Sequence, residues 1–140
     1  MQLLIKNAKL RNQEALVDIA IDGGLIQAVG KDVGQQAERV IDVGGALVTP
    51  ALIDPHIHLD KVNIFDVVRK NESGTLKEAI EIIWDKKKTY TDEDVLERSS
   101  DVVYKALKNG TLFMRTHVDV DTIGGLKPLS GVAKLKEKFK

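Results

Sequence analysis

The sequence predicts an α/β protein built in two parts, because the periodicity of its apolar residues changes near Pro50. Before this residue, short segments alternate apolar and polar residues in the two-residue period of half-buried strands. After it, strand-like runs alternate with segments of helical periodicity, which is typical of a parallel sheet covered by helices. The Gly- and Pro-rich passage over residues 44–50 separates the two patterns, so we expect domains over residues 1–49 and 50–140.

Length and composition restrict the classes of protein that the sequence can encode. A complete eight-stranded β/α barrel needs about 250 residues, so 140 residues cannot form one. The 21 basic and 21 acidic residues give a formal net charge of zero, which argues against a nucleic acid or an anionic membrane as partner. Cysteine is absent, which excludes disulfides and thiolate metal sites. The sequence has neither a signal peptide nor a run near the roughly 18 apolar residues of a membrane span, so we expect a cytoplasmic protein.

Residues 1–49 are predicted to form four or five strands and no helix. Residues 17–21 and 25–30 have the pattern of a hairpin, because the Asp-Gly-Gly sequence between them favours a tight turn. Further strands are expected over residues 3–10, 40–43 and 46–48. A sheet of this size leaves one face and one edge uncovered, so we expect it to pack against other structure.

Three segments of the second part have the features of helices. Thr75 and Glu78 have the spacing of a capping box, which predicts a helix start. Thr91 predicts the start of a longer helix that Gly110 ends, and Ser130 predicts a third start. The faces expected to pack against the core are Leu76, Ala79, Ile80 and Ile83 in the first helix, Val95, Ser99, Val102, Val103 and Ala106 in the second, and Val132, Ala133, Leu135 and Phe139 in the third.

The predicted strand over residues 51–60 carries ionisable side chains on one face. Its apolar residues are Ile53, Pro55, Ile57 and Leu59, and the alternate positions hold Asp54, His56, His58 and Asp60. Residues two apart share a face of a strand, with Cα atoms roughly 6.5–7 Å apart. His56 and His58 can therefore bind one ion through nitrogens at about 2.0–2.1 Å. An exposed edge strand whose polar face meets water explains the same pattern without a metal.

A second strand, predicted over residues 111–121, repeats this arrangement. Its polar face holds Arg115, His117, Asp119 and Asp121. If the two strands are parallel neighbours, His117 and Asp119 lie beside the histidine pair. Together with Asp60, they are then candidates to contact the metal-binding histidines or to face the substrate. A structural His–Asp and Arg–Asp network is the alternative, and we favour it for Arg115 and Asp121.

Four stretches form a combination that is more specific than the His-x-His pattern. They are Asp54-Pro55-His56-Ile57-His58-Leu59-Asp60-Lys61, Asn71-Glu72-Ser73-Gly74-Thr75-Leu76, the helix that contains Trp84, and Arg115-Thr116-His117-Val118-Asp119-Val120. In their order and approximate spacing, they resemble the amidohydrolase superfamily, and within it the cytosine deaminase-like branch. The resemblance implies that residues 1–49 are the N-terminal part of a small β-sandwich. It also implies that residues 50–140 are the first two strand/helix units of an incomplete β/α barrel, with strands at about 51–60 and 111–121.

The same resemblance implies a chemistry. It assigns His56 and His58 as ligands of a divalent metal, iron or zinc. The implied reaction is hydrolytic deamination of cytosine, or of a related cyclic amidine or amide, by metal-activated water. The family takes its other ligands and its proton shuttle from later strands, which have no counterpart in these 140 residues. We therefore expect the chain alone, as the N-terminal piece of a longer enzyme, to have little or no activity.

Two other functions fit the sequence. The chain can be a non-catalytic module, because two barrel strands and part of a sandwich leave open sheet edges. Such edges favour self-association into a homo-oligomer or pairing with a partner chain. It can also be a stand-alone metal-binding module with His56, His58 and His117 as ligands. The oligomeric state and the metal content of a His56→Ala/His58→Ala variant distinguish these alternatives.

Overall fold

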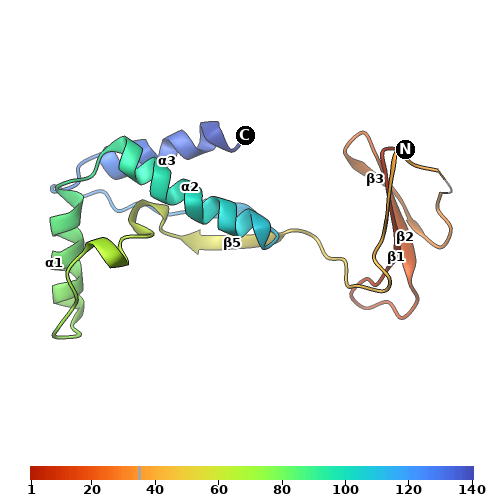
Figure 1. Cartoon of the computed structure of the whole chain (residues 1–140), viewed down its shortest axis with the longest axis horizontal. Helices are drawn as coiled ribbons and strands as arrows, with labels where there is room; N and C mark the ends of the chain where they lie inside the picture. The colour runs from red at the N-terminus through yellow and green to blue at the C-terminus, as the bar shows by residue number, and fades with distance from the viewer. Residues whose placement is uncertain (35) are drawn as a thin grey trace. The chain divides into compact units, whose positions relative to one another are not determined.

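The computed structural model describes residues 1–34 and 36–140, which form two compact units, Met1–Pro50 and Ala51–Lys140 (Figure 1). The first unit is a sheet, and the second combines two strands with three α-helices. The predicted α/β class is therefore confirmed, and the described residues contain no closed barrel. None of the helices in these two ranges is long and apolar enough to cross a membrane.

The first unit is a four-stranded sheet with the order β3–β2–β1–β4. Its strands are β1 (Leu3–Ala8), β2 (Val17–Asp22), β3 (Leu25–Gly30) and β4 (Arg39–Asp42). β2 pairs antiparallel with both β1 and β3, and β4 pairs parallel with β1. Gly23 and Gly24 have positive φ angles of 57° and 75°, the conformation of a tight hairpin turn. The predicted hairpin between β2 and β3 is thus confirmed.

In this unit, one predicted strand is shorter than expected and another is wrong. β1 ends two residues early, at Ala8, which is its last residue paired with β2, and this pairing is irregular between Ile5 and Ala8. Asn7 lies at this irregularity with a positive φ of 55°, a conformation that asparagine tolerates better than most residues. The strand expected over residues 46–48 is reduced to an isolated bridge between Leu47 and Lys9.

The second unit is built on two parallel strands. β5 (Leu52–Ile57) pairs with β6 (Thr111–Thr116). The segments that connect them are η1 (Leu59–Lys61), η2 (Phe65–Val67), α1 (Leu76–Lys87) and α2 (Asp92–Lys108), and α3 (Lys127–Lys138) follows β6. The parallel pairing brings the carboxyl ends of both strands to the same edge, as the sequence argument requires.

Both of these strands are shorter than predicted. β5 ends at Ile57 rather than residue 60, and β6 ends at Thr116 rather than residue 121. The polar alternation continues beyond each strand, but there the two-residue period no longer assigns a face. Asp60 therefore lies in η1, and Asp119 lies in the segment after β6.

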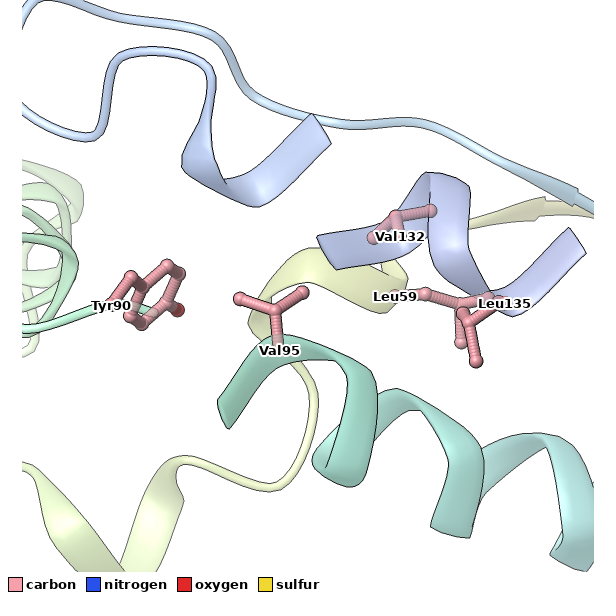
Figure 2. Close-up of a cluster of buried hydrophobic side chains, with 5 residues drawn as sticks. All are labelled: Leu59, Tyr90, Val95, Val132 and Leu135. Carbon is pink, nitrogen blue, oxygen red and sulfur yellow. The ribbon is translucent and has the colours of Figure 1, made fainter. Parts of the chain in front are cut away.

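A small apolar core fixes the carboxyl end of β5. Leu59 of η1 lies against Val132 and Leu135 of α3, while Val95 of α2 and Tyr90 complete the cluster (Figure 2). α2 and α3 pack against each other and lie on the same side of β5 (Figure 1). Because Leu59 is buried between these two helices, the chain immediately after His58 is held in place.

The helix starts follow local capping signals in two of three cases. The hydroxyl oxygen of Thr75 accepts a hydrogen bond from the Glu78 N–H at 3.3 Å, and that of Thr91 accepts one from the Asp94 N–H at 3.1 Å. Both predicted starts are confirmed. The third is wrong, because α3 begins at Lys127 with a proline in its first turn, and Ser130 instead donates to the Asp92 carboxylate at 2.5 Å.

The predicted apolar face of α1 is only partly buried. Leu76 is 76% exposed and Ile80 is 40% exposed. The residues of this helix that are buried are Ile82 and Lys87. Ala79 and Ile83 of the predicted face are half-buried, and Lys87, which continues this face, is buried. Amphipathic periodicity therefore predicts the helix and part of its buried face, but not the burial of a charged side chain at its carboxyl end.

Candidate metal centre

Two of the three histidines converge at the carboxyl end of β5. His56 is in the strand, and His58 lies between it and η1. Their Nε2 atoms are 3.4 Å apart. Two nitrogens that bind one tetrahedral ion at about 2.0–2.1 Å lie about 3.3–3.4 Å from each other. The pair therefore has the separation of two ligands of one ion.

Backbone contacts between the two strand ends hold this pair. The N–H of His117 donates to the carbonyl of Ile57 at 2.7 Å. The N–H of Leu59 donates to the hydroxyl of Thr116 at 3.1 Å. These bonds lie on either side of His58, so its backbone is fixed by β6 as well as by the core beneath Leu59.

Two carboxylates lie beside the second ring nitrogen of His58. Its Nδ1 atom is 3.5 Å from Oδ1 of Asp119 and 3.8 Å from Oδ1 of Asp60. Asp60 is 0% exposed, and its other oxygen accepts the N–H of Asp119 at 3.2 Å. Both His58 Nδ1 and Asp60 Oδ1 are buried without a hydrogen-bond partner. A proton held on Nδ1 by either carboxylate leaves Nε2 unprotonated, which is the form that binds a metal.

His117 lies beside the pair. Its ring stacks on that of His56, with centroids 4.1 Å apart and an interplanar angle of 29°. Burial lowers the pKa of His117, and the neighbouring His56, Arg115 and His58 lower it further. Within residues 1–34 and 36–140, no group of three or more His, Cys, Asp or Glu side chains is arranged to hold a metal ion.

Two lysines neutralise the acidic residues that follow β6. The Lys61 ammonium forms an ion pair with the Asp119 carboxylate, and this hydrogen bond is the main cause of the lowered pKa of Asp119. Lys87 Nζ is 2.5 Å from Asp121 Oδ2, and this hydrogen bond is likewise the largest cause of the lowered pKa of Asp121. Asp119 is therefore an anion beside His58.

The structure thus gathers all the site residues that the sequence singled out. His56, His58, Asp60, His117 and Asp119 lie at the paired ends of β5 and β6. Sequence reasoning missed Lys87. The one available signal was its position four residues after Ile83, on the face expected to be apolar.

The family model described as "Amidohydrolase family" matches residues 39–135. N-isopropylammelide isopropyl amidohydrolase of Pseudomonas sp. (strain ADP) is 31% identical to the chain over 142 residues. That alignment covers 99% of this chain and 35% of the relative. The chain therefore spans about a third of the length of this curated relative.

Two solved structures resemble the chain. 5-methylcytosine deaminase from Klebsiella pneumoniae, liganded with 5-fluorocytosine, matches with a TM-score of 0.84 and 33% identity, over 96% of this chain and 33% of the deaminase. N-isopropylammelide isopropylaminohydrolase from Burkholderia multivorans matches with a TM-score of 0.78 and 30% identity, over 99% of this chain and 35% of that one. Both matches agree with the resemblance that the motifs indicate. The chain belongs to the amidohydrolase family.

Proposed function

We propose that His56 and His58 are two ligands of a divalent metal, iron or zinc, in a hydrolase that cleaves carbon–nitrogen bonds. The observation that carries this proposal is the 3.4 Å separation of their Nε2 atoms at the carboxyl end of a parallel strand. Active-site residues of β/α barrels lie at this end of the strands. A bound metal supplies a Lewis acid that lowers the pKa of water toward neutrality.

The neighbouring side chains orient the two imidazoles and add no charge that would repel a cation. The Asp119 and Asp60 carboxylates lie 3.5 and 3.8 Å from Nδ1 of His58, so either can accept a hydrogen bond from an Nδ1–H group, which leaves Nε2 free for the ion. The stacked ring of His117 restricts rotation of His56. The lowered pKa of His117 keeps that ring neutral at neutral pH, so it adds no charge that would repel a cation.

We infer that the substrate is a cyclic amidine or amide. The support comes from two relatives at 30–33% identity, one named for deaminating 5-methylcytosine and the other for hydrolysing N-isopropylammelide. Both compounds carry an amino or alkylamino group on a ring carbon that is bonded to a ring nitrogen. Hydrolysis at that carbon releases ammonia or an amine, and deamination of cytosine or a close analogue is the reaction we propose.

The 140 residues alone are not expected to catalyse this reaction. Catalytic zinc sites have three protein ligands and an open position for water. The described residues supply two converging imidazoles and no larger ligand group. In this proposal, residues 1–49 are part of a β-sandwich and residues 50–140 are the beginning of a β/α barrel, and further strands supply the missing ligands.

Metal analysis and calorimetry with Zn²⁺ test the site. We expect the His56→Ala/His58→Ala variant to lose the bound metal that the wild type holds, and a His117→Ala variant to retain it. Equal metal content in the wild type and the double variant would rule out these ligands. Release of ammonia from cytosine or 5-methylcytosine by the isolated chain would contradict the predicted inactivity.

A second candidate function is association with another copy of the chain, and exposed apolar residues on β5 and β6 favour it. Ile53 is 67% exposed and Phe113 is 63% exposed. An apolar groove of about 440 Å³ also lies beside β6, lined by residues of α2 and α3. Parallel sheets are normally covered on both faces. In light scattering, we expect a dimer or larger species that Phe113→Ser weakens; a monomer at all concentrations would exclude this function.

A further inference from the structure

We infer that Lys87 is a positioning residue that holds Asp119 against His58 and thereby orients the metal-binding imidazole. The inference rests on the metal site proposed above. It extends that site to the end of α1, a helix that contributes none of the site residues predicted from the sequence.

The surroundings of Lys87 differ from those of an ordinary helix-end lysine. Its side chain is 2% exposed, whereas that of the next residue, Lys88, is 62% exposed. The ammonium lies 2.5 Å from Asp121 Oδ2, 3.4 Å from the carbonyl oxygen of Asp119 and 3.9 Å from Asp119 Oδ2. All three contacts belong to the segment after β6. A buried charge requires such partners, because its desolvation is otherwise uncompensated.

The turn after Asp121 leaves room for the Lys87 side chain. Oδ1 of Asp121 accepts the N–H groups of Ile123 and Gly124 at 2.9 and 2.7 Å, which closes a tight turn. A Cβ at Gly124 would lie 3.2 Å from Cδ of Lys87 and 3.3 Å from Cγ of Pro128. The lysine stem therefore passes through a space that a glycine leaves free, beside the turn that Asp121 closes.

A short chain of contacts leads from Lys87 to the imidazole. Residue 119 is held by Lys87 at its carbonyl, by Asp60 at its N–H and by Lys61 at its carboxylate. That carboxylate is 3.5 Å from the buried, unpaired Nδ1 of His58. A shift of the Asp119 backbone changes the distance between this carboxylate and Nδ1, and so the preference for a proton on Nδ1 over one on Nε2.

A Lys87→Met variant of the full chain tests this role, because it keeps the length of the stem and removes the charge. Lys88→Met is the matched control at the same helix end, where the exposed ammonium pairs with Asp85. A Lys87→Met/Asp121→Asn variant also removes the carboxylate that would be left unpaired, so it provides a folded protein if the single variant unfolds. The readouts are Zn²⁺ affinity by competition with a chromogenic chelator, the His58 tautomer of the metal-free protein by NMR, and Tm.

We expect both Lys87 variants to weaken Zn²⁺ binding by about tenfold and to shift His58 from its Nδ1–H toward its Nε2–H tautomer, while Lys88→Met matches the wild type. A lowered Tm with unchanged affinity and tautomer would show that Lys87 is only structural and would overturn the inference. If His56→Ala/His58→Ala leaves the Zn²⁺ affinity unchanged, the proposed metal site fails. The tautomer in metal-free protein then decides the role of Lys87 independently.

Discussion

Replacing Gly131 with alanine should destabilise the second unit, because α2 and α3 leave no room for a Cβ at this position. The added carbon would lie 2.6 Å from Cβ of Val95, 2.8 Å from its Cγ1 and 3.0 Å from the carbonyl oxygen of Asp92. Carbon atoms normally make contact at about 3.5–4.0 Å. Two of the three clashing atoms are a Cβ and a backbone oxygen, which a change of rotamer cannot move. The two helices must therefore separate by about 1 Å.

The expected magnitude is the difference of two effects. Overpacking of a core costs about 1–3 kcal/mol. The upper part of this range applies, because Val95 is fully buried and the clash involves backbone. Alanine has a higher helix propensity than glycine, which offsets about 1 kcal/mol. The net loss in the free energy of unfolding should be about 1–2 kcal/mol.

Urea unfolding followed by far-UV circular dichroism measures this loss. α1, α2 and α3 supply the helical signal, and all three lie in the second unit. Ala133→Gly is the control at an exposed position of α3, where helix propensity alone should cost about 1 kcal/mol. If Gly131→Ala instead stabilises the protein by about 1 kcal/mol, propensity dominates and the close helix contact does not exist.

Three further predictions concern caps, pH and ligands. Thr75→Ala should lower stability by about 1 kcal/mol, since it removes the N-cap of α1; thermal unfolding checks this. Hydrogen bonds from Ser73, and then from Arg69, lower the pKa of Glu78 from 4.5 to about 2. Because the folded pKa is the lower one, its stabilisation is complete above about pH 4.5 and is lost as the pH falls toward 2; circular dichroism should show less pH dependence for Glu78→Gln. His58→Ala should weaken Zn²⁺ binding at least tenfold, whereas His117→Ala should change it less than threefold. Equal losses in the two variants would instead support a site with three histidine ligands.

The parts of the fold that could be predicted depend on local signals. The β2–β3 hairpin follows from Gly23 and Gly24, which accept positive φ angles. The starts of α1 and α2 follow from Thr75 and Thr91, whose hydroxyls accept hydrogen bonds three residues later. Each of these interactions is complete within a few residues, so the sequence contains all that determines it.

The parts that could not be predicted depend on distant contacts. The alternating pattern continues through residue 60, but β5 ends at Ile57 because the chain turns to bury Leu59 between α2 and α3. The burial of Lys87 depends on Asp121, which is 34 residues away. Periodicity does not identify the helices that bury Leu59 or the carboxylate that pairs with Lys87, since a lysine near a helix end is usually solvated.

The candidate site was predictable because its two proposed ligands share one strand end. Spacing alone placed His56 and His58 within reach of one ion, and the family resemblance gave them a role. The surrounding carboxylates are different. Asp60 and Asp119 reach His58 from a short helix and a loop rather than from strand faces. The sequence therefore identified both carboxylates, but only the structure shows where they lie.

A crystal structure of the chain grown with Zn²⁺, with the ion located by anomalous scattering, tests the central claim most directly. We predict one zinc within about 2.0–2.1 Å of Nε2 of both His56 and His58. Zinc bound to only one of these imidazoles, bound through Nδ1 of His58, or found elsewhere on the chain would contradict the proposed centre.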